Sequence, residues 1–296
     1  MAMRVSIIGL GLIGGSLGLA LRGVGDVGAF VTGYVRRPEL GSRALSMGAV
    51  DSVKTELSEA VKGAGIVVVA TPVLTIRDIL VEVAEHLAPG CIVTDTASTK
   101  AEVVKWAMEV LPPQVSFVPG HPMAGKETYG ISAATPDLFK GCTYCLVPGN
   151  KASTEAMERI VELVHMLGAR PFFVEAEEHD RLVAGISHLP MLLSAVLVSA
   201  TTGNPSWDRM SRLAASGYRG LSRLASGSPR VNGDICLSNR EAILEWMDEF
   251  SREFERYRRL LMNGETGIVE VLADANRARE EWLESRRREE SEPATS

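Results

Sequence analysis

Three glycines with the spacing of a phosphate-binding loop stand near the start of the chain. They belong to the run Gly9-Leu10-Gly11-Leu12-Ile13-Gly14, which follows a short apolar segment and opens a stretch with helical periodicity. Glycines in this pattern permit a tight turn, close approach of the backbone to a pyrophosphate and close packing of helix on strand, while the helix N-terminus faces the anion. The run predicts dinucleotide binding; the alternative is a glycine-rich turn without a ligand.

Two arginines occupy a place where many dinucleotide enzymes have an acid. An NAD enzyme usually carries Asp or Glu about 20 residues after the glycines, where the acid binds the ribose 2′-hydroxyl. This chain has Gly33-Tyr34-Val35-Arg36-Arg37 there. Two guanidinium groups can hold a 2′-phosphate, so the segment favours NADP, with NAD as the other possibility. A solvated arginine pair is the alternative, and it does not explain the missing acid.

Two polar positions follow other predicted strands. Thr71 is restrained by Pro72, and we expect this pair to line the nicotinamide ribose, although a strand-ending turn would use the same residues. Further along, Thr99 and Glu102 have the spacing of a capping box that would start a helix. The neighbouring Ser98 is not needed for that box, so its hydroxyl is free to face the crevice.

A histidine in a loop is the predicted base. His121 lies in Gly120-His121-Pro122-Met123-Ala124-Gly125, after another predicted strand. An imidazole titrates near neutrality and suits removal of a hydroxyl proton as a hydride leaves the same carbon. His188 lies on a predicted buried helix, where a core histidine is the alternative. Arg219, Arg223 and Arg230 are cationic candidates that composition alone would place on the surface.

The elements that must position these residues alternate between short β-branched runs and helical segments. This alternation is typical of a parallel sheet of βαβ units. Strands are predicted at 4–8, 29–34, 65–70, 91–94, 115–119 and 143–147. Helices are predicted at 14–22, 43–47, 57–61, 76–87 and 99–111. The predicted fold class is therefore α/β, with a doubly wound, Rossmann-type domain whose candidate residues meet at the carboxyl edge of the sheet.

Helical periodicity dominates the second half of the chain, with one further strand predicted at 171–174. The predicted helix 178–201 is apolar on nearly all sides and must be buried in its domain or against a second subunit, and Pro190 predicts a kink in it. Further helices are predicted at 206–225, 240–262 and 267–288. We therefore expect a dinucleotide-binding domain at 1–170, an all-helical substrate and dimerisation domain at 171–288, and a disordered tail at 289–296.

Composition argues against several classes of protein. The 296 residues carry 31 Lys and Arg against 37 Asp and Glu, a net charge of −6, so nucleic acid is not an expected partner. The apolar run at 5–21 is shorter than a bilayer needs, and no membrane partner is expected. Four scattered cysteines favour a reducing cytoplasm. Cys142 and Cys145 could form half a zinc site or a redox pair, but without a second pair we predict strand packing and no metal.

Together, these motifs resemble the prephenate and arogenate dehydrogenase family, which oxidatively decarboxylates a cyclohexadiene in tyrosine biosynthesis. The resemblance extends from the glycine run to about Arg240. After that run it is carried, in order, by Asp95-x-x-Ser98-x-Lys100, Gly120-His121-Pro122-Met123-Ala124-Gly125-x-Glu127, Ser187-His188-Leu189-Pro190, and Gly217-Tyr218-Arg219 leading to Ser222-Arg223-Leu224-Ala225.

The resemblance implies a role for each matching residue. His121 would bind the substrate 4-hydroxyl and accept its proton, with Ser98 beside it and beside the nicotinamide. Arg223 would bind a substrate carboxylate, His188 would line the site and Glu127 would lie near its mouth. Loss of hydride from C4 gives a ketone conjugated to the carboxylated carbon, so release of CO2 forms an aromatic ring. The resemblance also implies a homodimer through the helical domain.

Two departures leave the substrate open. Met191 stands where the family often has a second histidine, and Asn232-Gly233-Asp234 replaces a Trp-Arg-Asp stretch. They affect the side-chain end of the pocket, so prephenate giving 4-hydroxyphenylpyruvate and L-arogenate giving tyrosine are both expected substrates. Two other functions are kept as alternatives: a β-hydroxyacid dehydrogenase or imine reductase of the same architecture, and an NADP-binding sensor without catalysis.

Overall fold

The computed structural model describes residues 3–23, 28–126, 128–149, 151–264 and 266–291, with side chains up to residue 288. The chain forms two compact units, one that extends to Arg240 and one that begins at Glu241. All residues of the candidate site belong to the first unit. This division by packing differs from the predicted division at residue 170, which stays a prediction.

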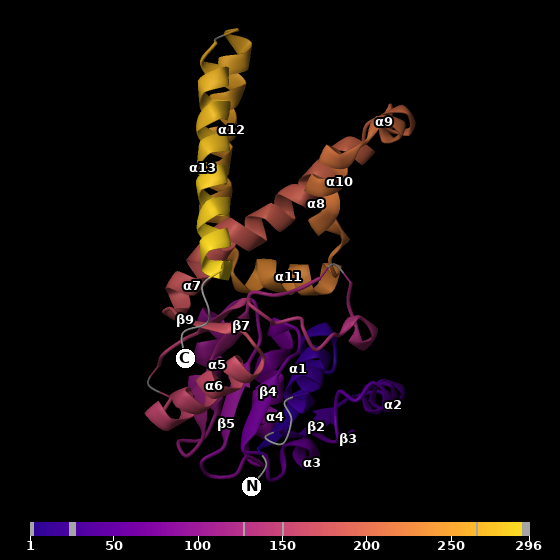
Figure 1. Cartoon of the computed structure of the whole chain (residues 1–296), viewed down its shortest axis with the longest axis vertical. Helices are drawn as coiled ribbons and strands as arrows, with labels where there is room; N and C mark the ends of the chain where they lie inside the picture. The colour runs from indigo at the N-terminus through magenta and orange to yellow at the C-terminus, as the bar shows by residue number, and fades with distance from the viewer. Residues whose placement is uncertain (1–2, 24–27, 127, 150, 265, 292–296) are drawn as a thin grey trace. The chain divides into compact units, whose positions relative to one another are not determined.

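A six-stranded, fully parallel sheet forms the centre of the first unit, in the order β3-β2-β1-β4-β5-β6 (Figure 1). The strands are β1 (Arg4–Ile8), β2 (Phe30–Tyr34), β3 (Ser52–Lys54), β4 (Ile66–Val69), β5 (Ile92–Asp95) and β6 (Ser116–Val118). All four residues of β4 are buried. A parallel strand covered on both faces reads as a continuous β-branched run, which is why the sequence reveals it.

Helices cover both faces of this sheet. On one side lie α1 (Leu12–Arg22), α2 (Pro38–Ser46) and α6 (Thr154–Met166), and on the other α3 (Leu57–Val61), α4 (Ile76–Ala84) and α5 (Ala101–Val110). The strand order reverses between β1 and β4, and ligands of such sheets bind outside the carboxyl ends of the strands at this point. The predicted doubly wound fold is confirmed.

A second sheet holds β7 (Gly120–Pro122), β8 (Thr143–Leu146) and β9 (Arg170–Phe173), in that order. β7 is antiparallel to β8, and β9 is parallel to it. The strand expected at 143–147 therefore exists but lies outside the main sheet, whose sixth member is β3. The sequence missed β3 because three partly exposed residues show no period. It also placed His121 in a loop, whereas His121 lies on β7 and pairs with Cys145.

One continuous helix consists of α7 (Ala176–Val183), a π-helical turn (Ala184–His188) and α8 (Leu189–Thr202). The interruption expected at Pro190 takes the form of this π turn, after which Pro190 lies in the first turn of α8. A π turn absorbs a missing backbone bond by shifting the register of its neighbours. By length and mean hydropathy (1.9) this is, among the described helices, the one that could cross a membrane, a test that core helices also pass.

The single helix predicted at 206–225 is wrong. The structure has α9 (Trp207–Leu213), α10 (Ser216–Ser222) and a 3₁₀ turn, η5 (Arg223–Ser226), followed by α11 (Pro229–Ser238). Ala214 and Ala215 are extended, with ψ of 116° and −155°. Gly217 and Gly220 then follow, and glycine lowers helix stability.

Two long helices, α12 (Arg240–Met262) and α13 (Gly267–Ser291), make up the second unit. The sequence predicted both helices. Since α13 reaches Ser291, the predicted tail begins three residues inside a helix, and residues 292–296 lie outside the described range.

Candidate active site

The glycine loop between β1 and α1 has the geometry that a bound phosphate requires. Gly9 has a φ of 102°, and a Cβ there would lie 2.6 Å from the Ala70 carbonyl oxygen. At Gly14 a Cβ would lie 2.0 Å from the Gly9 carbonyl oxygen, so this glycine permits the helix to pack on the turn. A Cβ at Gly11 would meet no heavy atom within 4 Å. The space beside Gly11 is therefore open to a ligand.

The N-terminus of α1 borders the same space. Gly11 is the N-cap, the described residues show no side chain that caps this helix, and its first turn carries no acid. The first N–H groups of a helix need partners, and with the helix dipole they favour an anion. Open space beside Gly11 and an uncapped helix N-terminus together fit the pyrophosphate of a dinucleotide.

Two neighbouring cavities collect the predicted cofactor residues. The larger, of about 800 Å³, is lined by Gly9, Leu10, Gly11, Arg36, Arg37, Thr71 and Pro72. The smaller, of about 380 Å³, is lined by Gly11, Leu12, Ile13, Thr71 and Pro72, together with Ser98. The cavities share Gly11, Ala70, Thr71, Pro72 and Gly130, so they are adjacent. Among the predicted cofactor residues, only Gly14 is absent from both linings, because it packs beneath the turn.

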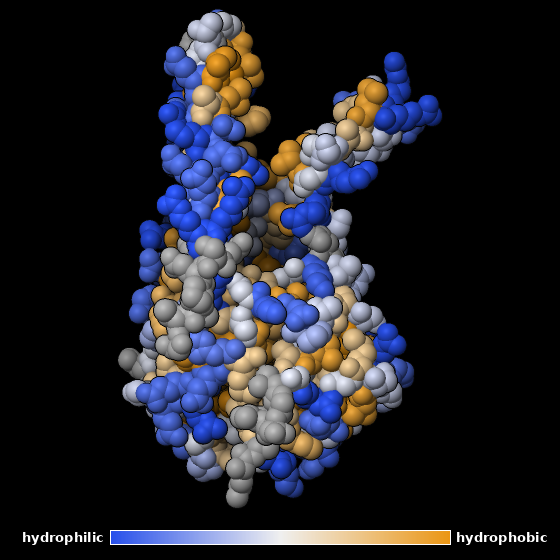
Figure 2. Space-filling view, viewed as in Figure 1, coloured by the Kyte–Doolittle hydropathy of each residue, from blue (hydrophilic) through white to orange (hydrophobic). Residues whose placement is uncertain are grey.

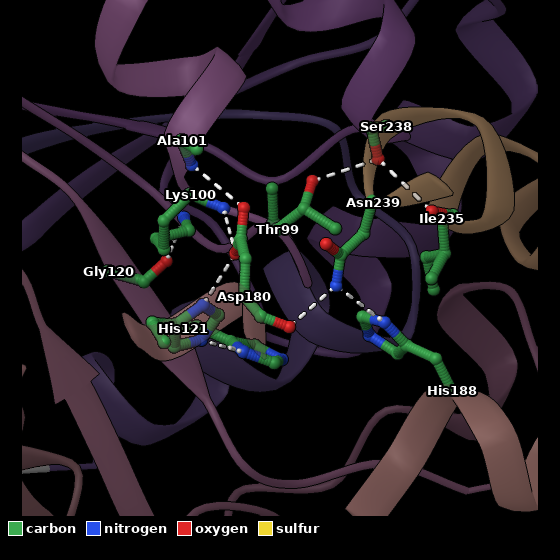
Figure 3. A network of polar contacts seen from close by, with 12 residues as sticks. Thr99, Lys100, Ala101, Gly120, His121, Asp180, His188, Ile235, Ser238 and Asn239 are labelled. Carbon is green, nitrogen blue, oxygen red and sulfur yellow. Dashed lines mark hydrogen bonds and ion pairs between the residues drawn. The ribbon is translucent and has the colours of Figure 1, made fainter. Parts of the chain in front are cut away.

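His121 belongs to a buried polar network (Figure 3). Its Nδ1 is 2.9 Å from Nε2 of His179, whose Nδ1 is 2.8 Å from Oδ1 of Asp180. Burial, followed by the nearby His179, Lys100 and His188, holds the pKa of His121 well below its usual 6.5. His121 is therefore neutral at physiological pH, as a base must be.

A fully buried ion pair fixes the backbone beside both predicted catalytic residues. Lys100 Nζ contacts Asp95 Oδ2 and donates to the Gly120 carbonyl oxygen at 2.6 Å. Asp95 in turn accepts from the N–H of Ala97 at 2.8 Å and from that of Gly120 at 3.2 Å. Ala97 precedes Ser98 and Gly120 precedes His121, so one carboxylate holds both segments in place.

The start of α5 corrects one expectation. The capping box of Thr99 and Glu102 does not form; Lys100 is the N-cap and no side chain of its own segment caps the helix. Instead, Asp180 from α7 accepts from the N–H groups of Lys100 at 2.7 Å and Ala101 at 2.9 Å. The Thr99 hydroxyl lies 2.9 Å from Ser238 Oγ on α11. A distant carboxylate thus takes the place of the local cap.

His188, at the end of the π turn, is 2% exposed and joins the same network. Its Nδ1 is 3.2 Å from Nδ2 of Asn239, which also donates to the Asp180 carbonyl oxygen at 2.7 Å. Burial lowers the pKa of His188 to about 4; the Asp180 carboxylate opposes this shift and His179 adds to it. Since the Asn239 amide donates, the neutral ring carries its proton on Nε2, which finds no partner within the part of the chain that the structure describes.

Some predicted residues are not brought to the cavities. His121, His188 and Arg223 are absent from both linings. Arg223 begins η5, which packs on α8. Glu127 lies outside the described residues. Lys126, Asn232 and Ile235 line the smaller cavity beside Ser98. Asn232, one of the departures from the family pattern, thus lies in the candidate site.

Cys145 lies on β8, and Cys142 directly precedes this strand. Burial raises the pKa of both Cys142 and Cys145 to about 11, so their thiolates are scarce at neutral pH. No group of three or more His, Cys, Asp or Glu side chains suited to a metal occurs among the described positions.

The sequence missed His179, Asp180 and Asn239. Their contacts with Lys100, His121 and His188, and that between Asn239 and Asp180, join residues 51 to 80 positions apart, and no local spacing predicts such pairs. The one available signal was a His-Asp pair at the polar start of an otherwise apolar helix.

Comparison with known proteins decides the family. The model of the prephenate dehydrogenase nucleotide-binding domain matches residues 17–173, and that of the prephenate dehydrogenase dimerization domain matches 175–274. The chain is 38% identical to the prephenate dehydrogenase of Bacillus subtilis over 258 residues, which cover 86% of this chain and 69% of that protein. The chain belongs to the prephenate dehydrogenase family. The resemblance found in its motifs is confirmed.

Solved members of the prephenate dehydrogenase family share the whole fold. Synechocystis arogenate dehydrogenase is 30% identical, with a TM-score of 0.80 over 95% of this chain and 100% of that one. The prephenate dehydrogenase of Aquifex aeolicus, solved with hydroxyphenyl propionate and NAD+, is 26% identical, with a TM-score of 0.88 over 95% and 98%. The chain is thus similar to solved proteins named for either substrate.

Proposed function

We propose that this protein is a prephenate or arogenate dehydrogenase of tyrosine biosynthesis. It oxidatively decarboxylates the cyclohexadiene acid to 4-hydroxyphenylpyruvate or tyrosine and transfers a hydride to a nicotinamide dinucleotide. The observation that carries the proposal is a dinucleotide cavity adjoining a Ser98-lined cavity in a chain of this family. Named relatives act on both substrate types, which supports the substrate class without choosing within it.

The cofactor rests on the glycine loop and α1. Residues 9–13 would hold the pyrophosphate, Gly14 would allow the close packing beneath it, and Thr71 with Pro72 would contact the ribose next to the nicotinamide. When bound, the nicotinamide supplies a hydride acceptor. The protein's own task is to orient the substrate carbon, keep water out and take a proton.

His121 is the proposed base. It accepts the proton of the substrate 4-hydroxyl while the C4 hydride departs, so that the oxygen becomes a carbonyl. The C–CO2 bond on the ring carbon opposite C4 then breaks. Its electron pair passes through the conjugated ring to the carbonyl oxygen, which takes back a proton and becomes the hydroxyl of the aromatic product. The lowered pKa of His121 keeps its ring neutral before the reaction.

The remaining substrate contacts are proposed from the family motifs. Ser98 would lie between His121 and the nicotinamide, which its place in the smaller cavity supports. Arg223 would bind a substrate carboxylate and His188 would line the pocket, with Glu127 near its mouth. The unpartnered Nε2 donor of His188 is suited to a substrate oxygen.

We propose that NADP is the preferred cofactor. Arg36 and Arg37 line the larger cavity at the end of β2, where no acid stands. Asp78 and Glu82 of α4 line the same cavity, and either carboxylate could accept from a ribose hydroxyl of NAD. Arg36→Gln with Arg37→Gln should raise KM for NADP by about 10-fold or more and leave KM for NAD nearly unchanged, since a hydrogen bond to a charged group contributes about 1.5 to 3 kcal/mol. Equal changes for both cofactors would refute the preference.

The proposed assembly is a cytoplasmic homodimer through the helical segments. The matched family model of residues 175–274 describes a dimerization domain. Apolar side chains lie exposed on α8, such as Val196 at 58%, and Figure 2 shows orange surface on α8 and α10. A monomer would leave this surface in water.

One comparative assay tests the function. Purified protein is given each of NADP and NAD with each of prephenate and L-arogenate, and absorbance at 340 nm is followed. At least one combination should give reduced cofactor and an aromatic product. Turnover of simple β-hydroxyacids alone would favour the related dehydrogenase class, and NADP binding without any turnover would favour a sensor.

A further inference from the structure

Three buried side chains form a hydrogen-bonded line that ends at His121. His121 Nδ1 meets His179 Nε2 at 2.9 Å, and His179 Nδ1 meets Asp180 Oδ1 at 2.8 Å. Their exposed fractions are 8%, 1% and 5%. His179 and Asp180 have no role in the proposed function described above.

Asp180 sets the direction of the hydrogen bonds along this line. Its Oδ1 accepts from the N–H of Lys100 and its Oδ2 from that of Ala101, at the N-terminus of α5 (Figure 3). Both carboxylate oxygens thus already accept a backbone hydrogen bond at the positive end of the α5 dipole. A carboxylate only accepts, so His179 must donate to it from Nδ1.

The donor and acceptor roles of His179 in turn determine those of His121. When Nδ1 of a neutral His179 carries the proton, its Nε2 is an acceptor. His121 must therefore donate from Nδ1, which places the lone pair of its neutral ring on Nε2. Within the described chain no hydrogen bond reaches Nε2 of His121, so this nitrogen remains for a substrate.

We propose that His179, held by Asp180, is a positioning residue that keeps His121 in the Nδ1–H tautomer, with Nε2 as the base. The catalytic part rests on the proposed function. The substrate hydroxyl proton moves to Nε2, and the O–H electron pair forms the carbonyl as the hydride passes from C4 to the nicotinamide. His121 becomes an imidazolium that still donates through Nδ1 to His179.

The charges around His121 explain why such a line is useful. The groups that face it are His179 on α7, Lys100 at the start of α5 and His188 in the π turn, and all three disfavour a positive ring. Lys100 is paired with Asp95. The Asp180 carboxylate lies on the far side of the His179 ring. Its negative charge stabilises the positive charge that forms on His121 during turnover.

Two substitutions of the full-length protein separate positioning from packing. His179→Phe keeps a ring but removes the acceptor, so kcat should fall about 10²-fold, at the low end of acid–base effects, with little change in KM for NADP. His179→Gln offers an amide oxygen to His121 Nδ1–H and should regain at least about 10-fold of that loss. His165→Gln, at an exposed site on α6, is the control and should match wild type. Wild-type kcat in His179→Phe, or equal losses in Phe and Gln, would overturn the proposal.

A spectroscopic readout on the wild-type protein needs no variant to fold and no activity. Long-range ¹H–¹⁵N NMR of histidine-labelled protein at about pH 8 distinguishes Nδ1–H from Nε2–H rings. His121 and His179 should both be Nδ1–H. His121 with its proton on Nε2 would overturn the proposal even if the enzyme is active. A wild type that turns over neither cyclohexadienyl substrate would instead refute the proposed function and leave the tautomer result standing.

Discussion

At the scale of single residues, Gly11 and Gly14 form a matched pair for testing the cofactor loop. Gly11→Ala should fold normally but bind NADP more weakly, because its Cβ meets no protein atom within 4 Å and would occupy ligand space. Gly14→Ala should lower the free energy of unfolding by about 1 to 3 kcal/mol, because its Cβ would lie 2.0 Å from the Gly9 carbonyl oxygen. Thermal unfolding and NADP titration of both variants check this. Intact NADP affinity in Gly11→Ala would contradict the loop assignment.

The lowered pKa of the buried His188 predicts that the folded protein loses stability in acid. Its pKa is about 4 in the folded protein and about 6.5 when unfolded, so between these values the unfolded chain binds more protons. The free energy of unfolding should therefore fall as the pH drops from 7 to 4, by up to about 3 kcal/mol from this group. His121 is shifted in the same direction and adds to the fall.

Urea unfolding at several pH values measures this effect. His188→Leu should flatten the pH dependence relative to wild type, while His165→Leu, at an exposed site, should leave the slope unchanged. Equal slopes in wild type and His188→Leu would refute the burial of a neutral His188.

The sequence predicted several residues that line the two cavities. They include Gly9, Gly11, Arg36, Arg37, Thr71 and Ser98. His179, Asp180 and Asn239 were not predicted, because their contacts join distant segments.

At the scale of elements, the start of α5 shows why local rules reach only so far. Thr99 and Glu102 have the spacing of a cap, yet Asp180 from α7 supplies it. Asp180 also contacts His179, so the residue that caps α5 holds the ring that is hydrogen-bonded to His121, the proposed base. A tertiary contact from Asp180 thus takes the place of the local capping box of Thr99 and Glu102.

The strands likewise divide into those that the sequence predicted and those that it did not. β1 and β4 are buried on both faces and gave clear β-branched runs. β3 and β7 have three residues each and gave no periodic signal. The sheet to which 143–147 belongs could not be predicted, because strand pairing is set by register across distant segments.

The exposed face of α8 predicts an effect on assembly. Val196→Glu puts a charge on this apolar surface and should shift the protein from dimer towards monomer in light scattering after gel filtration. Val81→Glu, on α4 of the nucleotide-binding side at 54% exposure, is the matched control and should keep the wild-type mass. Identical masses for both variants would argue against α8 as part of the interface.

At the scale of the whole molecule, one buried network links the segments that the reaction must coordinate. Asp95 on the main sheet holds the segments of Ser98 and His121, and Asp180 and Asn239 connect these to α5, α7 and α11. The first unit thus combines a dinucleotide cavity with a neutral histidine held in a fixed orientation. A dehydrogenase of this family needs both the dinucleotide cavity and the histidine at one site, because the reaction moves a hydride and a proton.

The measurement that tests this account most directly is the turnover of His121→Asn. With the better cofactor and substrate pair, kcat should fall about 10²- to 10⁴-fold, the usual cost of losing an acid–base group. NADP affinity and thermal stability should stay near wild type, and His165→Asn should remain fully active. Unchanged kcat in His121→Asn would contradict the assignment of His121 as the base.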